Sequence, residues 1–388
     1  MRKLLRGFAA FIMLVMFCVN VSASAVSATA EIENELVAST NEGNKWRIGY
    51  CESQPYFEFD GTLYYIVKGL QELGWVANTE GFKYTPFQED TRTMWKWLSE
   101  NDMGPYIEFV KDAYYDMSEQ PDTGEKVVKR LSEKKDIDLM IVNGTYAALN
   151  TANDKHSVPT LVFSTSNAVQ SEIIKSPTDS GHKHVWAHVD PERFKRQVEI
   201  FYDIFKFKKV GLVYENSYRK VFAAVDDVEE VSKERGFEIE HYYVDGPVDD
   251  NDYDRYINDV IKAHKVLAEK VDAMYVTNGA WKFSDLPKLL KPFYDKRIPV
   301  FSQAGSIEVR NGALMSIARA NFLGIGRFGA DKIARIFNGS LSGELSQVFE
   351  DTPNIAINME AADKIGYRPT FEILLVADEI YTSIENNK

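Results

Sequence analysis

Short apolar runs alternate with amphipathic stretches along most of the chain. The runs 138–142 and 159–163 are almost continuously apolar, which is typical of strands buried on both faces of a parallel sheet. Between such runs, apolar residues recur at three- and four-residue spacing, which predicts helices; one of them begins after Asp190-Pro191, a pair typical of helix starts. Strands that alternate with helices are joined by right-handed crossovers into parallel sheets. The pattern therefore predicts an α/β fold with two doubly wound lobes.

Each expected strand is a short run rich in apolar residues between polar or glycine-containing segments. The expected strands are 46–50, 82–87, 138–142, 159–163, 210–214, 237–243, 272–276 and 298–301. After the first thirty residues, no stretch approaches the roughly 18 consecutive apolar residues of a membrane span. The main part of the chain is therefore expected to fold outside the bilayer.

The first thirty residues combine a basic start with one short apolar stretch, from Phe8 to Val19, which is too short to cross a bilayer and stay there. Small-residue motifs of the Ala-x-Ala kind follow it. We therefore predict a cleavable secretory signal peptide over residues 1–30, and which motif is cut stays open. Because no small residues precede Cys18, no lipid anchor is expected, and the mature chain is expected in the periplasm.

Composition narrows the possible partners. The chain has 45 Lys and Arg against 58 Asp and Glu, and its formal net charge is −13. An acidic surface repels phosphate groups, so neither nucleic acid nor anionic lipid is expected as a partner. Of the two cysteines, only Cys51 lies outside the predicted signal, so the mature chain has no intramolecular disulfide. We expect a monomer whose ligand is a small molecule.

Short hydrogen-bonding side chains follow most of the expected strands. In open parallel sheets, ligands bind beyond the carboxyl ends of the strands, where helix N-termini also offer unpaired N–H groups. We therefore predict ligand contacts from residues near these ends: Glu52, Ser53, Asn143, Thr145, Ser164, Thr165, Ser166, Asp190, Tyr214, Glu215, Asn216, Asn278, Trp281 and Gln303. Each Ser, Thr or Asn among them is also explained as a helix cap, so the prediction depends on their convergence.

Three acidic residues are candidates for pairing with a ligand ammonium. Asp190 precedes a proline at a helix start, which is a capping signature, but its carboxylate could also pair with a ligand ammonium. Glu52 and Glu215 are the other candidates for that ammonium. Trp281 could cover an apolar part of the ligand.

Three sharper motifs receive other interpretations. The glycines of 324–329 fit a dinucleotide-binding pattern, but the apolar spacing around them indicates a helix rather than a strand-to-helix turn. His182, His184 and His188 stand close together without a further ligand at metal spacing, so no metal site is predicted, although metal binding by these three stays open. Cys51 has no evident base nearby and is interpreted as a packing residue.

The C-terminal third carries a family resemblance. Its segments are IPVF at 298–301, GALMS at 312–316, LG at 323–324, ARIFNG at 334–339 and an Asn–Ala–Gly pattern over 357–366. In order and spacing they resemble the ABC-transporter substrate-binding family that includes tryptophan- and tyrosine-type binders. The resemblance extends over most of residues 46–388 and is weaker in the first lobe.

The resemblance implies a type I periplasmic-binding-protein fold, in which two Rossmann-like lobes are joined by three hinge crossings and hold the ligand between them. It places lobe 1 at 46–187 and 305–346, and lobe 2 at 188–304 and 347–388. It also implies a binding site at the strand ends already named.

The implied function is extracytoplasmic solute binding. The protein would deliver a small polar ligand to the membrane subunits of an ABC importer, with an amino acid, and among these an aromatic one, as the candidate. Neither a cofactor nor catalysis is expected. Two alternatives stay open: a sensor that passes its ligand-bound state to a membrane receptor, and an exported hydrolase, which would need Glu52 and Glu215 to meet in the cleft.

Overall fold

The computed structural model describes residues 36–86, 88, 90–215, 224–317, 321–350 and 355–385. The predicted signal peptide and the predicted ligand contact Asn216 lie outside these residues. By its internal contacts the chain divides into Met1–Val37 and Ala38–Lys388, and the fold below is that of the second unit. Among the helices described, none combines the length and the apolar character that crossing a membrane requires.

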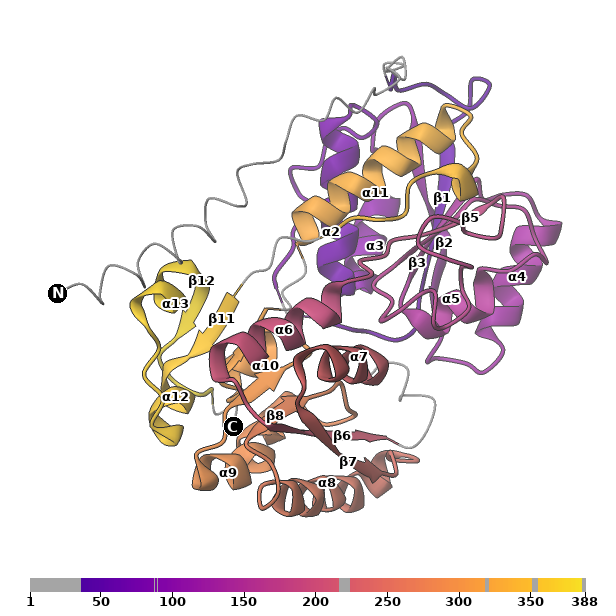
Figure 1. Cartoon of the computed structure of the whole chain (residues 1–388). Helices are drawn as coiled ribbons and strands as arrows, with labels where there is room; N and C mark the ends of the chain where they lie inside the picture. The colour runs from indigo at the N-terminus through magenta and orange to yellow at the C-terminus, as the bar shows by residue number, and fades with distance from the viewer. Residues whose placement is uncertain are drawn as a thin grey trace. The chain divides into compact units, whose positions relative to one another are not determined.

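Lobe 1 is built on a parallel five-stranded sheet in the order β2-β1-β3-β4-β5 (Figure 1). Its strands are β1 (Trp46–Glu52), β2 (Ile107–Asp116), β3 (Leu139–Asn143), β4 (Thr160–Phe163) and β5 (Val185–Ala187). Its helices are α2 (Phe59–Glu72), α3 (Thr91–Glu100), α4 (Thr123–Glu133), α5 (Thr145–Thr151) and, from much later in the chain, α11 (Phe322–Phe337), which packs against α2. β3 and β4 are buried along their whole length, as their apolar sequences predict.

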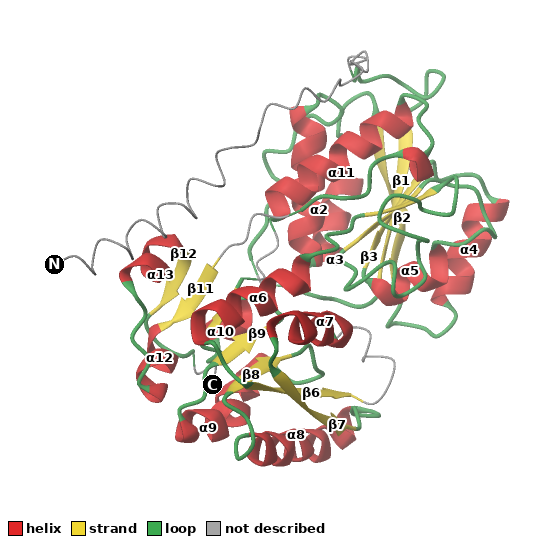
Figure 2. Cartoon of the chain, in the orientation of Figure 1, coloured by secondary structure: helices red, strands yellow, loops and turns green. Residues whose placement is uncertain are grey.

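Lobe 2 is built on a seven-stranded sheet in the order β12-β11-β10-β9-β8-β6-β7 (Figure 2), in which only β10 and β11 pair antiparallel among the described strands. Its strands are β6 (Lys209–Glu215), β7 (Glu238–Val244), β8 (Ala273–Val276), β9 (Val300–Ser302), β10 (Met315–Ser316), β11 (Ile355–Asn358) and β12 (Ala377–Tyr381). Its helices are α6 (Arg193–Phe205), α7 (Val225–Arg235), α8 (Tyr253–Leu267), α9 (Leu286–Lys296), α10 (Ser306–Arg310), α12 (Met359–Ile365) and α13 (Phe371–Val376). Short 3₁₀ turns lie at Asp250–Asp252 and Phe283–Asp285, and a third, Ser342–Glu344, contacts β5 of lobe 1.

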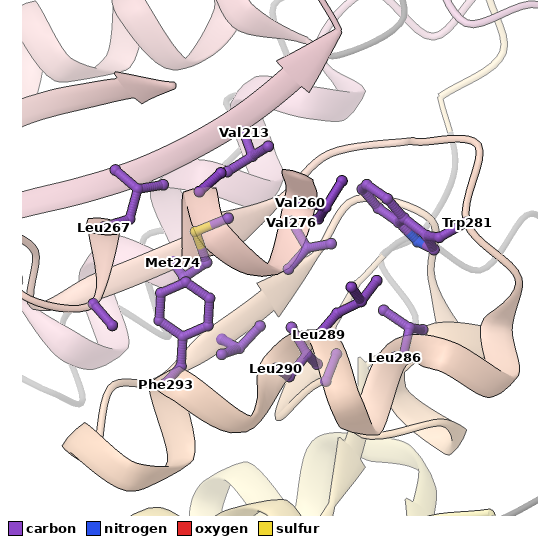
Figure 3. Close-up of a cluster of buried hydrophobic side chains, with 14 of the residues drawn as sticks. Val213, Val260, Leu267, Met274, Val276, Trp281, Leu286, Leu289, Leu290 and Phe293 are labelled. Carbon is purple, nitrogen blue, oxygen red and sulfur yellow. The ribbon is translucent and has the colours of Figure 1, made fainter. Parts of the chain in front are cut away.

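Two apolar clusters cover the two faces of the lobe 2 sheet. Leu212 and Tyr275 belong to one cluster, whereas their chain neighbours Val213 and Met274 belong to the other. Successive residues of a strand point to opposite faces, so this alternation requires helices on both sides of the sheet. Figure 3 shows the second cluster, where α8 and α9 pack against β6 and β8.

Two hinge segments run side by side between the lobes. The chain leaves β5 and enters α6 through residues 188–192, and residues 347–349 run beside that segment. Val189 N donates to Gln347 O at 3.0 Å, and Phe349 N donates to Val189 O at 3.1 Å. Backbone hydrogen bonds therefore tie the two crossings together.

The return to lobe 1 differs from the predicted boundary at residue 305. Both α10 and β10 follow Gly305 and remain in lobe 2, where Met315 pairs with Phe301 of β9 and with Ile357 of β11. The chain enters α11 only at Phe322. A two-residue strand contains no apolar run that a sequence pattern can detect, which is why the boundary was set too early.

The described part of the predicted strand 82–87 is a loop, and the partner of β1 at the edge of the sheet is β2 instead. The apolar character of that loop has another cause, because Phe82 is buried against the rings of Tyr64 and Trp97. As an edge strand, β2 alternates between buried and exposed positions and so has no continuous apolar run.

The glycines of 324–329 lie in α11, as the apolar spacing around them predicts. A Cβ atom on Gly326 would lie 2.4 Å from the backbone carbon of Tyr65 in α2, and one on Gly329 would lie 2.7 Å from the ring of Phe163. These glycines therefore allow α11 to approach α2 and β4 closely.

Candidate functional site

A cavity of about 340 Å³ lies where the carboxyl end of β4, the first hinge segment and the starts of α2, α6 and α7 come together. Its lining consists mainly of residues 58, 62 and 164–169 from lobe 1, 188–192 from the hinge, and 193–195, 227 and 230 from lobe 2. Both lobes thus contribute polar groups to one cavity, at the end of the sheet where parallel α/β folds bind ligands.

Four of the predicted ligand contacts line this cavity, namely Ser164, Thr165, Ser166 and Asp190. Ser164 has a left-handed φ of 52°, which turns the chain directly after β4. Its Oγ lies 3.2 Å from Thr62 Oγ1 on α2, and the N–H of Ser166 donates to Thr145 Oγ1 at 3.4 Å. The turn is therefore fixed from two sides, with its hydroxyls at the cavity wall.

Asp190 is nearly buried and forms an ion pair with Arg196, which lies further along α6. The helix itself begins at Arg193, and the N-cap residue Glu192 makes no side-chain capping bond. A ligand ammonium at Asp190 would therefore share the carboxylate with a guanidinium that is already in place.

Glu52 does not line the cavity. Its carboxylate is fully buried and accepts hydrogen bonds from the hydroxyls of Tyr50, Thr91 and Tyr114, each at 2.8 Å. Burial raises the pKa of Glu52, and the three donors oppose that rise. Its hydrogen-bonding capacity is used inside lobe 1, where it connects β1, α3 and β2.

Three further predicted contacts of lobe 1 also lie outside the cavity lining. Ser53 Oγ accepts from the N–H of Ala147 at 2.9 Å, so it satisfies a backbone donor in the first turn of α5. Asn143 is fully buried and donates from Nδ2 to Tyr50 Oη at 3.1 Å. Thr145 supports the turn after β4, as described above. For these residues the capping and packing interpretation describes the observed contacts.

Apart from Asp190, the predicted contacts of lobe 2 that the structure describes gather near the carboxyl ends of β6, β8 and β9 and do not line the cavity. Tyr214 donates from its hydroxyl to Tyr243 Oη at 2.9 Å. Glu215 Oε1 accepts from the N–H of Ala280 at 3.2 Å, and Gln303 Oε1 accepts from the N–H of Asn278 at 3.2 Å. These contacts join neighbouring strand ends to one another.

Trp281 belongs to the core rather than to a ligand surface (Figure 3). Its indole Nε1 donates to Glu308 Oε1 at 3.0 Å, and Ser302 Oγ donates to Glu308 Oε2 at 2.6 Å. Glu308 is only 1% exposed, and burial raises its pKa to about 7. A buried carboxylate therefore holds the loop of Trp281 against the end of β9.

Charged residues in the first turns of helices were missed by the sequence analysis, which considered the residues directly after strands. Arg193 lies 4.0 Å from Glu58 of lobe 1, and Lys195 pairs with Glu230 at 2.6 Å. Asp227 lies in the first turn of α7, where burial raises its pKa to about 6 against the opposing effect of Lys195. The signal that could have found them is charge in the opening turn of a predicted helix that follows a strand end.

A second hollow, of about 380 Å³, is lined by residues of α9 and α12 and by Ile384, all from lobe 2. None of the predicted contacts lines it. Its lysines are paired with carboxylates of their own helices, Lys291 with Asp295 at 2.7 Å and Lys364 with Glu360 at 3.1 Å. The cavity shared by both lobes is therefore the candidate site.

The clustered histidines separate into two groups. The ring of His184 lies 5.2 Å from that of His156 and 6.0 Å from that of His182, which pairs with Asp154 at 2.8 Å. His188 is part of the hinge and donates from Nε2 to Phe349 O at 3.3 Å, and burial lowers its pKa to about 4. Within the described ranges, no group of three or more His, Cys, Asp or Glu is arranged to hold a metal ion.

Comparison with known proteins gives one family match by sequence. The profile of the family described as ABC transporter substrate binding protein matches residues 103–381. The tyrosine-binding protein of Clostridioides difficile strain R20291 is 23% identical over 243 residues, which cover 62% of this chain and 66% of that protein. The alignment thus spans just under two thirds of the relative's length.

Solved structures share the fold over 87% of this chain. One is an ABC domain in complex with L-Trp from Streptococcus pneumonia, with a TM-score of 0.63, 18% identity and 99% of its length covered. A ligand-free, open substrate binding protein with adhesive properties from Clostridium difficile has a TM-score of 0.62 and 21% identity, and 100% of its length is covered. A conserved domain protein from Vibrio cholerae has a TM-score of 0.61, 18% identity and 99% coverage. At these identities the likeness establishes the shared fold.

Proposed function

The chain belongs to the family of ABC transporter substrate-binding proteins and has the type I periplasmic-binding-protein fold, and on this premise we propose that it binds a small polar solute in the cavity shared by both lobes and delivers it to an ABC importer. The observation that carries the proposal is the convergence of polar groups from β4, the hinge, α6 and α7 on one cavity of about 340 Å³.

Solute binding would be coupled to the approach of the lobes. Three contacts already reach from lobe 1 to lobe 2: Glu58 to Arg193 at 4.0 Å, Gln170 to Asp226 at 2.6 Å, and the rings of Phe57 and Phe283 at 5.7 Å. A solute that touches both lobes adds to these contacts only when the lobes are together, so it favours the closed state. The closed complex is the form that an importer would distinguish from the empty protein.

An amino acid is the candidate solute. The cavity offers hydroxyls and the N-terminal turns of α6 and α7 for a carboxylate, and carboxylates for an ammonium. The names of two relatives, one in complex with L-Trp and one tyrosine-binding, make aromatic amino acids part of the first panel to test.

We propose an extracytoplasmic location, reached through a cleavable signal over residues 1–30, and a monomer that meets the importer's membrane subunits through its lobe surfaces. No catalytic step is proposed. The hydrolase alternative relies on Glu52 and Glu215, and Glu52 is held by three hydroxyls within lobe 1. That arrangement supports a structural role for this carboxylate over a reacting one.

The test is a thermal-shift screen of residues 31–388 against amino acids, sugars, nucleosides and small carboxylates, followed by calorimetry. A solute that binds only the native state adds about 2.7 kcal/mol of stability at one hundred times its dissociation constant. Arg193→Gln, which removes a charge from the cavity, should change the affinity for the solute that is found, whereas Arg92→Gln, on the surface of lobe 1 with 56% of its side chain exposed, should leave it at the wild-type value. Equal affinities in the two variants would place the binding site elsewhere.

A further inference from the structure

The charges of the cavity are unequal. Among its described lining residues, five carry carboxylates and two carry cationic side chains: Glu58, Asp190, Glu192, Asp227 and Glu230 against Arg193 and Lys195. His188 adds no charge near neutral pH, because burial lowers its pKa to about 4. The described part of the cavity lining therefore has an excess of negative charge.

Both cations of the cavity are already engaged by carboxylates. Arg193 lies 4.0 Å from Glu58, and Lys195 lies 2.6 Å from Glu230. A third cation, Arg196, pairs with Asp190. An anionic solute would have to displace one of these carboxylates and would then lie beside the others, which Coulomb repulsion in a partly desolvated site opposes.

Two of the five lining carboxylates form no ion pair with a residue that the structure describes: Glu192, which is exposed, and Asp227. Asp227 is half-buried in the first turn of α7 and lines the cavity. Lys195 is close enough to stabilise its charge, but the Nζ atom of that lysine already donates to Glu230. A half-buried carboxylate without a counter-ion of its own has more to gain from a bound cation than any paired group beside it.

A metal ion is a poor occupant for this position. In the described part of the chain, no three ligating side chains come together around a common point. An organic ammonium or guanidinium needs only one or two acceptors, which a single carboxylate beside hydroxyl groups supplies.

From this geometry we propose that the solute carries a net positive charge and that Asp227 receives its ammonium or guanidinium group. The inference rests on the proposed solute-binding function and adds to it the charge of the ligand. It sets this chain apart from relatives named for tyrosine and tryptophan, whose side chains carry no cation.

The experiment compares charged solutes with neutral ones of nearly the same shape, by calorimetry on residues 31–388. L-arginine is paired with L-citrulline, and L-lysine with L-norleucine. The wild-type protein should bind at least one cationic member at least about tenfold more tightly than its neutral counterpart. Because this comparison uses the unaltered protein, it does not depend on the folding of a variant.

Asp227→Asn should then reduce the preference for the cationic solute over its neutral counterpart to less than about threefold. The change in this ratio of affinities between wild type and variant measures the coupling between Asp227 and the charge of the solute, as in a double-mutant cycle. Glu229→Gln is the matched control, since Glu229 lies on the same helix and does not line the cavity. It should keep the wild-type preference. Melting curves of both variants report whether they fold.

The other outcomes are distinct. If tyrosine, leucine or another neutral or acidic solute binds more tightly than every cationic one, the inference is wrong and the solute-binding function stands. If cations are preferred but a folded Asp227→Asn protein keeps that preference, the assignment to Asp227 is wrong. If no solute of either panel binds, the proposed function fails, and this inference fails with it.

Discussion

A buried carboxylate lies at or beside a strand end in each lobe, and it is held by donors of its own lobe. Glu52 accepts from three hydroxyls at the end of β1, and Glu308 accepts from Trp281 and Ser302 at the end of β9. Removing a charge from water is costly unless hydrogen bonds replace the lost hydration. These groups therefore fix loops at the strand ends, and neither of them lines the candidate cavity.

Glu308 should make stability depend on pH. Its pKa is about 7 in the folded protein against an ordinary value of 4.5, so the folded state binds its proton more tightly. The stabilisation is complete below pH 4.5 and is lost as the pH rises through 7, with an upper limit of about 3 kcal/mol. Urea unfolding at several pH values should show that Glu308→Gln loses this component of the pH dependence.

The exposed Glu133→Gln serves as the control for that measurement and should keep the wild-type pH dependence. If Glu308→Gln and wild type lose stability in parallel between pH 4.5 and 8, the carboxyl of Glu308 does not titrate in this range.

At the residue scale, sequence reasoning located strand ends better than side-chain directions. Ser164 and Asp190 line the cavity, whereas Glu52 and Trp281 are turned into the protein. All four lie in or near loops that follow strands, so their spacing in the sequence predicts each of them equally well as a ligand contact. What separates them is which donors fold back onto each side chain, and those donors, such as Tyr114, come from distant parts of the chain.

At the scale of elements, the strands buried on both faces were predictable, and the edge and two-residue strands were not. β3 and β4 combine continuous apolar runs with full burial. β2, at the edge of its sheet, and β10, which has two residues, have no such run. Both are defined by their pairing with neighbours, which a local pattern does not contain.

The contact between α11 and α2 should be sensitive to one methyl group. Gly326→Ala would place a Cβ 2.4 Å from the backbone of Tyr65, where no flexible side chain can move aside. We expect the free energy of unfolding, measured by urea titration, to fall by about 1–3 kcal/mol.

Gly211→Ala is the matched control for this contact. Its new Cβ would lie 3.2 Å from Met274 Sδ, on a side chain that can adjust, and the loss should be less than about 1 kcal/mol. Equal losses in the two variants would mean that the helices can separate slightly without cost.

At the scale of the whole molecule, the division into two lobes was predictable from strand number and from the family resemblance. The prediction failed at the return crossing, because α10 and β10 continue lobe 2 beyond Gly305. The cavity could not be predicted without the assembled chain, since its charged residues come from the N-cap of α2 in lobe 1, from the hinge, and from α6 and α7 in lobe 2.

A disulfide between the lobes should report their approach. Gln170 and Asp226 lie on different lobes, with Nε2 and Oδ2 2.6 Å apart. In Gln170→Cys/Asp226→Cys, a saturating solute should speed up disulfide formation, measured by gel mobility without reductant. Cys51 will not interfere, because it is fully buried and burial raises the pKa of its thiol. The single-cysteine variants are the controls, and a rate that the solute leaves unchanged would argue against coupling between binding and closure.

The packing of α11 on α2 has a consequence for the order in which the protein matures. Residues 46–187 leave the ribosome long before residues 322–337, so the face of α2 that receives Gly326 stays uncovered while all of β6 to β10 is synthesised. Lobe 1 cannot reach its final packing on the nascent chain. The folding of lobe 1 is thus completed only after residues 322–337 have been synthesised, when most of lobe 2 has already left the ribosome.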